Sequence, residues 1–296
     1  PVLSFVELRK DIFKKFKVIS DRKYSFFSDY SFTIENLKSD PNEFLLTFKP
    51  DFIFTGTSYT SNIEIEFIKF SKQLNIKTYS YLDHSTLIKK RFQLADSYFF
   101  PDLILVPNIE IQNHALKELM NLTKVDILNN PYLEQLSNWK PNISKNAFFK
   151  IENIHFRSNS KVILIALDPI SNLKNSNNFG FDEGVGLNEI SHIVDNLENN
   201  FTYLIKPHPN QDLKIIKKNV SNKIQVLNSD INTKHLIYYS DIVVGFFSNI
   251  LVEASALNKD IIRYHPLGIK NDPFINKNLG QIANKFNLSD IFVKYE

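Results

Sequence analysis

Two short stretches in the second half of the chain carry polar residues at points where a buried strand must end. In the first, the apolar residues 203–205 lead into the run Lys206-Pro-His-Pro-Asn210. Proline fits neither a helix interior nor a sheet ladder, so the predicted strand stops here and leaves Lys206 and His208 at its carboxyl end. A histidine held in this way can donate a hydrogen bond to a phosphate or to a leaving-group oxygen. Lys206 either adds positive charge to such a site or is a solvated strand end.

The second stretch runs from the apolar residues 242–244 to Ser248 and Asn249, and residues 250–257 then have helical character. Serine and asparagine are preferred caps of helix N-termini. A helix that starts at the carboxyl end of a parallel strand is a common place for a phosphate group. Because the cap alone also explains both residues, the phosphate hypothesis depends on His208 lying nearby.

Several acidic residues are candidates for chemistry on a ligand. Glu253 lies one turn into the helix that follows Ser248, where it either points to solvent or reaches the hydroxyl groups of a ligand. Asp83 and His84 follow an apolar run, and they form either a general-base pair or a turn with an Asx cap. Glu183 lies in a short Asp-Glu-Gly motif that also fits an ordinary turn.

The first half of the chain alternates strand and helix patterns. Strands are predicted at residues 52–54, 77–82, 102–106 and 125–128, and helices at residues 62–74 and 109–119. This alternation indicates βαβ units, in which right-handed crossovers bring the carboxyl ends of all strands to one edge of a parallel sheet. That edge holds Asp83 and His84. It also holds Gly56, Thr57 and Ser58, whose small side chains and N–H groups leave room for a substrate.

The second half repeats the alternation. Strands are predicted at residues 161–167, 201–205, 224–227, 242–244 and 261–264, and helices at residues 187–197, 213–220, 234–239 and 279–286. The chain is therefore predicted to be an α/β protein with two Rossmann-like parallel-sheet domains. Residues 1–135 form the first domain, residues 136–160 a linker without a clean period, and residues 161–296 the second domain. Because the chain begins at Pro1 without a methionine, we expect that an N-terminal element is missing.

Composition excludes several classes of function. The chain has 296 residues, 35 of them basic and 32 acidic, without a run of five or six like charges, so nucleic acid is not an expected partner. The absence of cysteine excludes disulfides and thiolate chemistry and fits the cytoplasm. No apolar stretch is long enough to span a membrane. Without a metal-binding or dinucleotide-binding motif, neither a metal nor a cofactor is expected.

The strand-end residues resemble those of GT-B glycosyltransferases, which have two Rossmann-like domains that face each other across a cleft. His208-Pro209 and the turn at Ser248-Asn249 are similar to the motifs of bacterial sialyltransferases, Kdo transferases and capsule polymerases. The letters Asp182-Glu-Gly184 also match a sialyltransferase motif, although that motif lies in the N-terminal domain of the family. In place of the family's usual Ser-Ser pair this chain has Ser248-Asn249.

The resemblance implies an inverting, metal-independent transferase that moves a sugar, such as a nonulosonic acid or Kdo, from CMP to a cell-surface glycan. Residues 161–296 would bind the nucleotide sugar, and residues 1–135 a glycan or lipid-linked acceptor, which leaves a peripheral membrane contact open. Either Asp83 or Glu183 would deprotonate the acceptor hydroxyl. The implied donor contacts are Lys206, His208, Asn210, Ser248, Asn249 and Glu253.

A second resemblance covers the first half of the chain. Residues 49–58 and 79–84 look like the non-hydrolysing UDP-N-acetylglucosamine 2-epimerases. The Gly-Asp-Thr and Glu-Ala-Gly signatures of those enzymes are replaced by Gly56-Thr-Ser58 and Asp83-His-Ser85, which favours a shared fold over shared chemistry. The alternatives are thus a UDP-sugar epimerase, which needs an acidic residue in the first domain, and a non-catalytic binding module.

Overall fold

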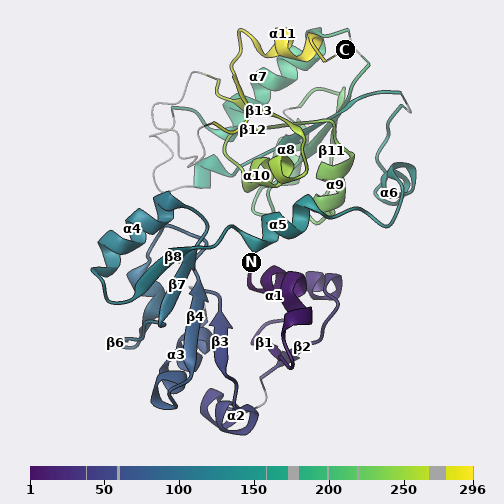
Figure 1. Cartoon of the computed structure of the whole chain (residues 1–296). Coiled ribbons are helices and arrows are strands. Elements are labelled where there is room, and N and C mark those ends of the chain that lie inside the picture. Colours follow the sequence, from purple (N-terminus) through teal and green to yellow (C-terminus); the bar gives the residue numbers. More distant parts are fainter. Residues whose placement is uncertain are drawn as a thin grey trace. The chain divides into compact units, whose positions relative to one another are not determined.

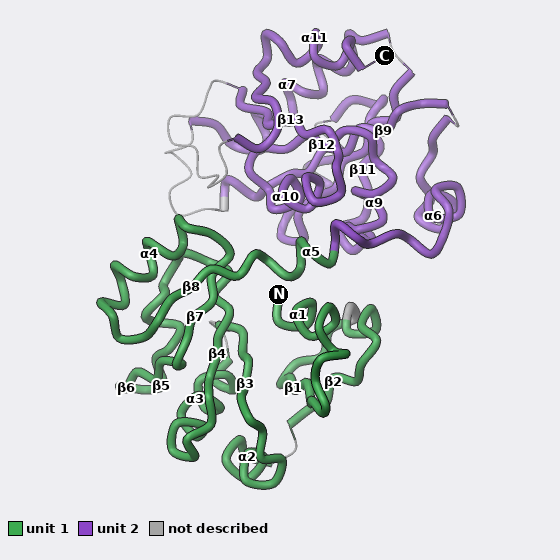
Figure 2. The backbone as a smooth tube through the Cα atoms, viewed as in Figure 1, with its two compact units in different colours: residues 1–135 green, residues 136–296 purple. Residues whose placement is uncertain are grey.

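The computed structural model describes the chain apart from residues 38, 59–60, 158, 173–179, 199, 219, 267–277 and 296. The chain divides into two compact units, residues 1–135 (unit 1) and residues 136–296 (unit 2), which Figure 2 colours separately. Each unit is built on a parallel sheet with helices packed against it. The predicted α/β class is confirmed.

Unit 1 begins with a small α/β segment and continues as strand–helix repeats (Figure 1). Its elements are α1 (Val2–Arg9), η1 (Lys10–Ile12), β1 (Val18–Ser20), η2 (Ser25–Asp29), β2 (Ile34–Asn36), α2 (Pro41–Phe48), β3 (Phe52–Thr55), α3 (Ile63–Gln73), β4 (Lys77–Tyr81), η3 (Lys89–Phe92), β5 (Gln93–Leu94), β6 (Ser97–Tyr98), β7 (Leu103–Val106), α4 (Ile109–Leu119), β8 (Lys124–Ile127) and α5 (Pro131–Ser137), which runs past the unit boundary.

The main sheet of unit 1 has the order β3-β4-β7-β8, and all of its pairs are parallel. Local sequence sets where the helices start. For example, Asp40 accepts hydrogen bonds from the N–H groups of Asn42 and Glu43, and Pro41 takes the first position of α2. The core lies among α3, α4 and the strands, where Leu82 and Ile104 are fully buried. The carboxyl ends of β3 and β4 are therefore adjacent on a rigid sheet.

Unit 2 repeats the strand–helix pattern with longer buried strands. Its elements are α6 (Lys145–Ile151), β9 (Val162–Ala166), η4 (Ile170–Asn172), α7 (Glu183–Asn196), β10 (Thr202–Lys206), α8 (Leu213–Lys218), β11 (Ile224–Val226), α9 (Thr233–Tyr239), β12 (Ile242–Gly245), α10 (Asn249–Ala256), β13 (Asp260–Tyr264), β14 (Gln281–Ala283) and α11 (Leu288–Val293).

The sheet of unit 2 has the order β11-β10-β9-β12-β13-β14 and is parallel throughout. Every residue of β9, β10 and β12 is buried, as expected for strands covered on both faces. Alternate residues enter two cores: Ile163 and Ile165 pack on the face of α7 and α11, whereas Val162 and Leu164 pack on the face of α6, α9 and α10. Figure 1 shows these helices around the sheet.

Two segments differ from the pattern expected from sequence. Residues 136–160 were expected as a linker, yet they include α6, whose Phe148 and Phe149 are buried in the core of unit 2. The helix predicted at residues 279–286 is wrong. The chain instead forms β14, which pairs with β13, and then α11.

Candidate functional site

The carboxyl ends of β9 and β12 mark the point where the strand order of unit 2 changes direction. From β9 the sheet continues outward through β10 to β11, and from β12 it continues the other way through β13 to β14. Ligands of open parallel sheets bind in the crevice at such a switch point. The two stretches singled out from sequence follow β10 and β12, so both lie at this edge of the sheet.

The His208 ring is fixed by its own loop. Its Nδ1 accepts a hydrogen bond from the Asn210 backbone N–H at 3.2 Å, and the His208 N–H donates to Oε1 of Gln211 at 2.8 Å. Burial, and after it the positive charge of Lys206, lowers the pKa of His208 and so favours the neutral ring. A neutral ring whose Nδ1 is an acceptor carries its proton on Nε2. His208 can therefore donate a hydrogen bond to a ligand oxygen.

Ser248 caps α10 as predicted from sequence. Its hydroxyl oxygen accepts from the Ile250 N–H at 3.4 Å, and the exposed Asn249 is the first residue of the helix. A Cβ at Gly245 would lie 3.2 Å from the carbonyl oxygen of Ala166, so glycine lets the end of β12 pack closely against β9. The N–H groups and the partial positive charge of the α10 N-terminus are thus held at the switch point, where they can bind an anion.

Asp168, two residues after β9, is a buried acidic residue of this edge. Its Oδ2 accepts from the Phe247 N–H at 3.2 Å, and the Ser248 hydroxyl donates to the same carboxyl group. Burial raises the pKa of Asp168 to about 6; the two hydrogen bonds oppose the increase, and the nearby charge of Glu183 adds to it. Asp168 thus titrates close to neutral pH.

Gln211 connects these groups. Its Nε2 donates to the main-chain oxygen of Asp168 at 3.2 Å, and its Oε1 accepts from the His208 N–H. The loops after β9 and β10 are therefore joined through one side chain, and Asp168 continues the connection to the turn before α10. The groups at this edge that could donate hydrogen bonds to a phosphate are therefore connected by one hydrogen-bond network.

Lys206 is directed toward main-chain oxygens. Only 6% of its surface is exposed, and its Nζ lies 3.3 Å from the Ser229 oxygen and 3.5 Å from the Pro207 oxygen. Burial lowers the pKa of Lys206, while the charges of Glu253 and Asp230 act in the opposite direction. Lys206 and Glu253, two residues implied as donor contacts, thus lie close enough to interact with each other.

Glu183, expected as a base, holds the loop after β9. Its two carboxylate oxygens accept from the Ser171 hydroxyl at 2.6 Å and from the Ser171 N–H at 2.8 Å. Its neighbour Asp182 accepts from the Val185 N–H and caps α7. The Asp-Glu-Gly motif therefore begins α7 and holds the loop after β9 in place. The charge of Glu183 also acts on Asp168.

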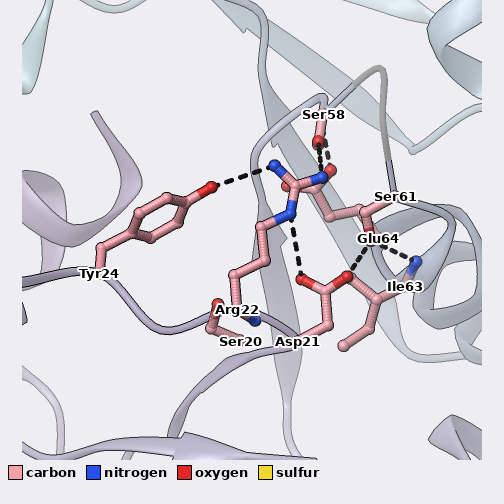
Figure 3. A network of polar contacts seen from close by, with 8 residues as sticks. All are labelled: Ser20, Asp21, Arg22, Tyr24, Ser58, Ser61, Ile63 and Glu64. Carbon is pink, nitrogen blue, oxygen red and sulfur yellow. Dashed lines mark hydrogen bonds and ion pairs between the residues drawn. The ribbon is translucent and has the colours of Figure 1, made fainter.

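In unit 1 a second acidic residue that the sequence argument passes over, Glu64 of α3, lies against the strand end after β3 (Figure 3). Its Oε2 accepts from the Ser58 N–H at 2.5 Å. A Cβ at Gly56 would lie 2.6 Å from its Oε1, so the glycine makes room for this carboxyl group. Burial raises the pKa of Glu64, and the charges of Asp21 and Asp83 add to the increase.

Arg22 approaches the same strand end from the loop after β1. Its guanidinium group donates to Ser58 Oγ at 3.2 Å and to the Tyr24 hydroxyl at 3.1 Å, and Nε lies 3.9 Å from Oδ1 of Asp21. Asp21 in turn accepts from the Ser61 hydroxyl, as Figure 3 shows. Positive charge is thus present beside Glu64, but burial outweighs its effect on the Glu64 pKa.

The other site residues predicted in unit 1 either make contacts within the fold or are exposed to solvent. The Thr57 hydroxyl donates to the Tyr81 oxygen at 3.2 Å, and Arg91 donates to the Thr57 oxygen at 2.7 Å. Asp83 and His84, after β4, are both exposed. Asp83 therefore faces solvent while its charge still raises the pKa of Glu64.

Neither a metal cluster nor a membrane span is found in the part of the chain that the structure describes. Among those residues no three His, Asp or Glu side chains gather as metal ligands would. None of the described helices combines the length and the apolar character that crossing a bilayer requires.

Comparison with known proteins identifies the fold. Neither a protein-family model nor a curated protein matches the sequence. The UDP-GlcNAc 2-epimerase of Neisseria meningitidis, solved with UDP-GlcNAc, has a similar structure at a TM-score of 0.70 and 16% identity, covering 99% of this chain and 87% of that chain. The UDP-GlcNAc 2-epimerase of Methanocaldococcus jannaschii gives a TM-score of 0.65 at 14% identity, covering 99% of this chain and 88% of that chain. MurG of Acinetobacter baumannii gives 0.50 at 9% identity, covering 100% and 86%. The chain thus has a GT-B-type fold, as predicted.

Proposed function

We propose that the protein is a sugar-nucleotide enzyme of the UDP-N-acetylglucosamine 2-epimerase kind, which is the alternative left open by the sequence. The observation that carries this proposal is the pair of acidic side chains at the strand edge of unit 1. Glu64 has a raised pKa, and Asp83 lies close enough to contribute to it. The sequence argument required an acidic residue in this domain, and Glu64 supplies one from α3 rather than from the strand-end motif.

Unit 2 has the role of binding the nucleotide part of the ligand. His208 presents an Nε2–H donor, and α10 presents its N-terminal N–H groups at the same strand edge. These are suitable partners for the oxygens of a diphosphate, because they donate hydrogen bonds without requiring a metal ion. The similar epimerase of Neisseria meningitidis was solved with UDP-GlcNAc bound, which supports a UDP-sugar as the ligand class.

Unit 1 has the role of proton transfer to and from the sugar. Epimerisation at carbon 2 of UDP-GlcNAc can proceed if the C2–H bond breaks together with the C1–O bond to UDP, so that the electron pair forms a C1–C2 double bond. Return of UDP to carbon 1 and of a proton to the other face of carbon 2 then gives the second epimer. A carboxyl group whose pKa is raised is a stronger base when ionised, so it is better suited than an ordinary carboxylate to accept a proton and return it. Glu64 meets this requirement through burial, and Asp83 provides a second carboxyl group at the same edge.

Incubation with UDP-GlcNAc in D2O tests this function directly. Because the abstracted proton exchanges with solvent before it is returned, the enzyme should introduce deuterium at carbon 2 of the sugar and generate the second epimer, both visible by proton NMR. The Glu64→Gln variant should show neither signal change. Retention of the original C–H bond throughout prolonged incubation with the wild-type protein would contradict the proposal.

A second candidate, the CMP-dependent transferase of the sialyltransferase or Kdo transferase group, is favoured by one observation. The His-Pro loop and the Ser248 turn occupy the switch point, where they suit a departing nucleotide phosphate. In that reaction Asp83 is the better base, because both carboxylate oxygens of Glu183 are bonded to Ser171. Thermal shifts with CMP, CDP, UDP and GDP distinguish the two: stabilisation by CMP alone would favour the transferase.

A further inference from the structure

Asp168 occupies the place where a bound phosphate needs hydrogen-bond donors. Its side chain accepts from the Phe247 N–H and the Ser248 hydroxyl, both in the turn that leads into α10. Only 9% of its surface is exposed, so water does little to screen its charge. The carboxyl group therefore takes up donors at the same helix N-terminus that would bind an anion.

The charges around Asp168 do not neutralise it. Glu183, at the start of α7, is negative and raises the pKa of Asp168. After β10, Lys206 is directed to main-chain oxygens, and the lowered pKa of His208 favours a neutral ring. On α10, Glu253 is also acidic, and its charge acts on Lys206. An additional anion at this edge would meet a net repulsion from an ionised Asp168.

We propose that Asp168 is a further ligand-binding residue, which contacts the ligand's phosphate as a neutral carboxylic acid and must be protonated for tight binding. This proposal rests on the proposed function and names one more residue of the same site. The neutral acid keeps a carbonyl oxygen that can accept from Phe247, and it gains an O–H group that can donate to a phosphate oxygen.

The consequence is uptake of a proton on binding. Because the pKa of Asp168 is about 6, the proton that binding requires must be taken up from solvent above that pH, and this lowers the affinity by up to about tenfold for each pH unit. The phosphates of UDP-GlcNAc are suited to the test, because a phosphate diester lacks the second ionisation, near pH 6, of a phosphate monoester. Any change in affinity between about pH 6 and 8 then comes from the protein.

The experiment is a calorimetric titration of the full chain with UDP-GlcNAc at several pH values. The wild-type affinity should fall by up to about tenfold for each pH unit above 6. Asp168→Asn keeps a carbonyl acceptor and gains N–H donors without titrating, so its affinity should stay constant over this range and exceed that of the wild type at about pH 8 by tenfold or more.

Two further measurements keep the proposal testable if Asp168→Asn folds poorly. Repeating the wild-type titration in buffers with different ionisation enthalpies gives the number of protons taken up, which should approach one at about pH 7.5. His208 is the histidine of the same site, and burial lowers its pKa. His208→Gln should bind more weakly at every pH but keep the wild-type pH dependence.

The outcomes separate the two proposals. If the wild type binds UDP-GlcNAc without proton uptake, or if Asp168→Asn retains the wild-type pH dependence, the role of Asp168 is overturned while the proposed function stands. The same holds if His208→Gln alone abolishes the pH dependence. If neither UDP-GlcNAc nor a CMP-sugar binds at any pH, the proposed function fails and the role of Asp168 fails with it.

Discussion

The two strand edges of this protein use the same architecture for different electrostatic purposes. In unit 2 the carboxyl ends of the strands present hydrogen-bond donors, the His208 ring and the N-terminus of α10, beside the buried carboxyl group of Asp168. In unit 1 the corresponding edge presents carboxyl groups, those of Glu64 and Asp83. Both edges belong to parallel sheets, so the difference comes from a few residues rather than from topology.

This comparison teaches that the sheet supplies a location and the side chains supply the chemistry. An anion is favoured where backbone N–H groups and a neutral histidine converge. The carboxyl pair of unit 1 would repel a phosphate, but it is well suited to proton transfer. Our proposal is therefore that unit 2 binds the ligand and unit 1 performs acid–base chemistry, and each variant below changes one edge and leaves the other intact.

The largest expected effect is on turnover in the Glu64→Gln variant. Removing a general acid–base group should slow deuterium incorporation into UDP-GlcNAc by about 10²- to 10⁴-fold. The affinity for UDP-GlcNAc should change little, because the amide can still accept from the Ser58 N–H. Glu66→Gln, on the same helix, is the matched control and should keep wild-type turnover. Equal rates for both variants would remove Glu64 from the chemistry.

A smaller effect is expected for Gly186→Ala in unit 2. A Cβ at Gly186 would lie 2.5 Å from ring carbons of the buried Phe246, which directly follows β12. Overpacking of this kind should lower the free energy of unfolding by about 1–3 kcal/mol, measured by urea denaturation. At the exposed Gly184, a Cβ would approach only the Asp182 carboxylate, at 3.1 Å. Gly184→Ala should therefore not destabilise the protein, and an equal loss in both variants would refute this explanation.

The Asp168→Asn variant should change how stability depends on pH. In the folded protein the pKa of Asp168 is about 6, above its ordinary value of 3.8, so folding disfavours the ionised form. Wild-type stability should therefore fall as the pH rises from about 4 to 6, and the asparagine variant should not share this loss. Relative to the wild type, the variant should gain on the order of 2 kcal/mol between about pH 4 and 7. If the free energies of unfolding of the two proteins, measured by urea denaturation, change in parallel with pH, this prediction is contradicted.

Only a small change in stability is expected for Gly56→Ala in unit 1. The new Cβ would meet the Glu64 carboxylate, which is the end of a flexible side chain and can move. The free energy of unfolding should therefore change by less than about 1 kcal/mol, whereas turnover should fall because Glu64 is displaced. A large decrease in the free energy of unfolding together with unchanged turnover would show that Gly56 serves only the fold.

Much of the fold was predictable because buried parallel strands leave a strong apolar signal. The strands predicted at residues 161–167 and 242–244 correspond to β9 and β12. The terminal helix was predicted wrongly because Leu279, Ala283 and Phe286 have helical spacing. Leu279 and Ala283 are buried, but Phe286 is 80% exposed, so no continuous apolar face exists.

The site was only partly predictable. His208 and Ser248 were singled out because proline and cap residues are local signals, and their roles in binding stay predictions. Glu64 and Asp168 were missed because their roles depend on contacts with distant segments: Glu64 looks like the polar face of a helix, and Asp168 like a turn residue. Helical spacing alone would place Ile63, Phe67, Phe70 and Leu74 on one apolar face of the helix predicted at residues 62–74, whereas the buried residues of α3 are Ile65, Phe67, Ile68 and Ser71. Such contacts are long-range and leave no pattern in the sequence.

The most direct test of this division of roles is the affinity of UDP-GlcNAc for three proteins: wild type, His208→Ala and Glu64→Gln. Our account predicts that His208→Ala weakens binding by about tenfold or more, because a donor to the phosphate is lost, while Glu64→Gln binds as tightly as the wild type. Weak binding by Glu64→Gln together with unchanged binding by His208→Ala would contradict the account, because it would place the nucleotide site in unit 1.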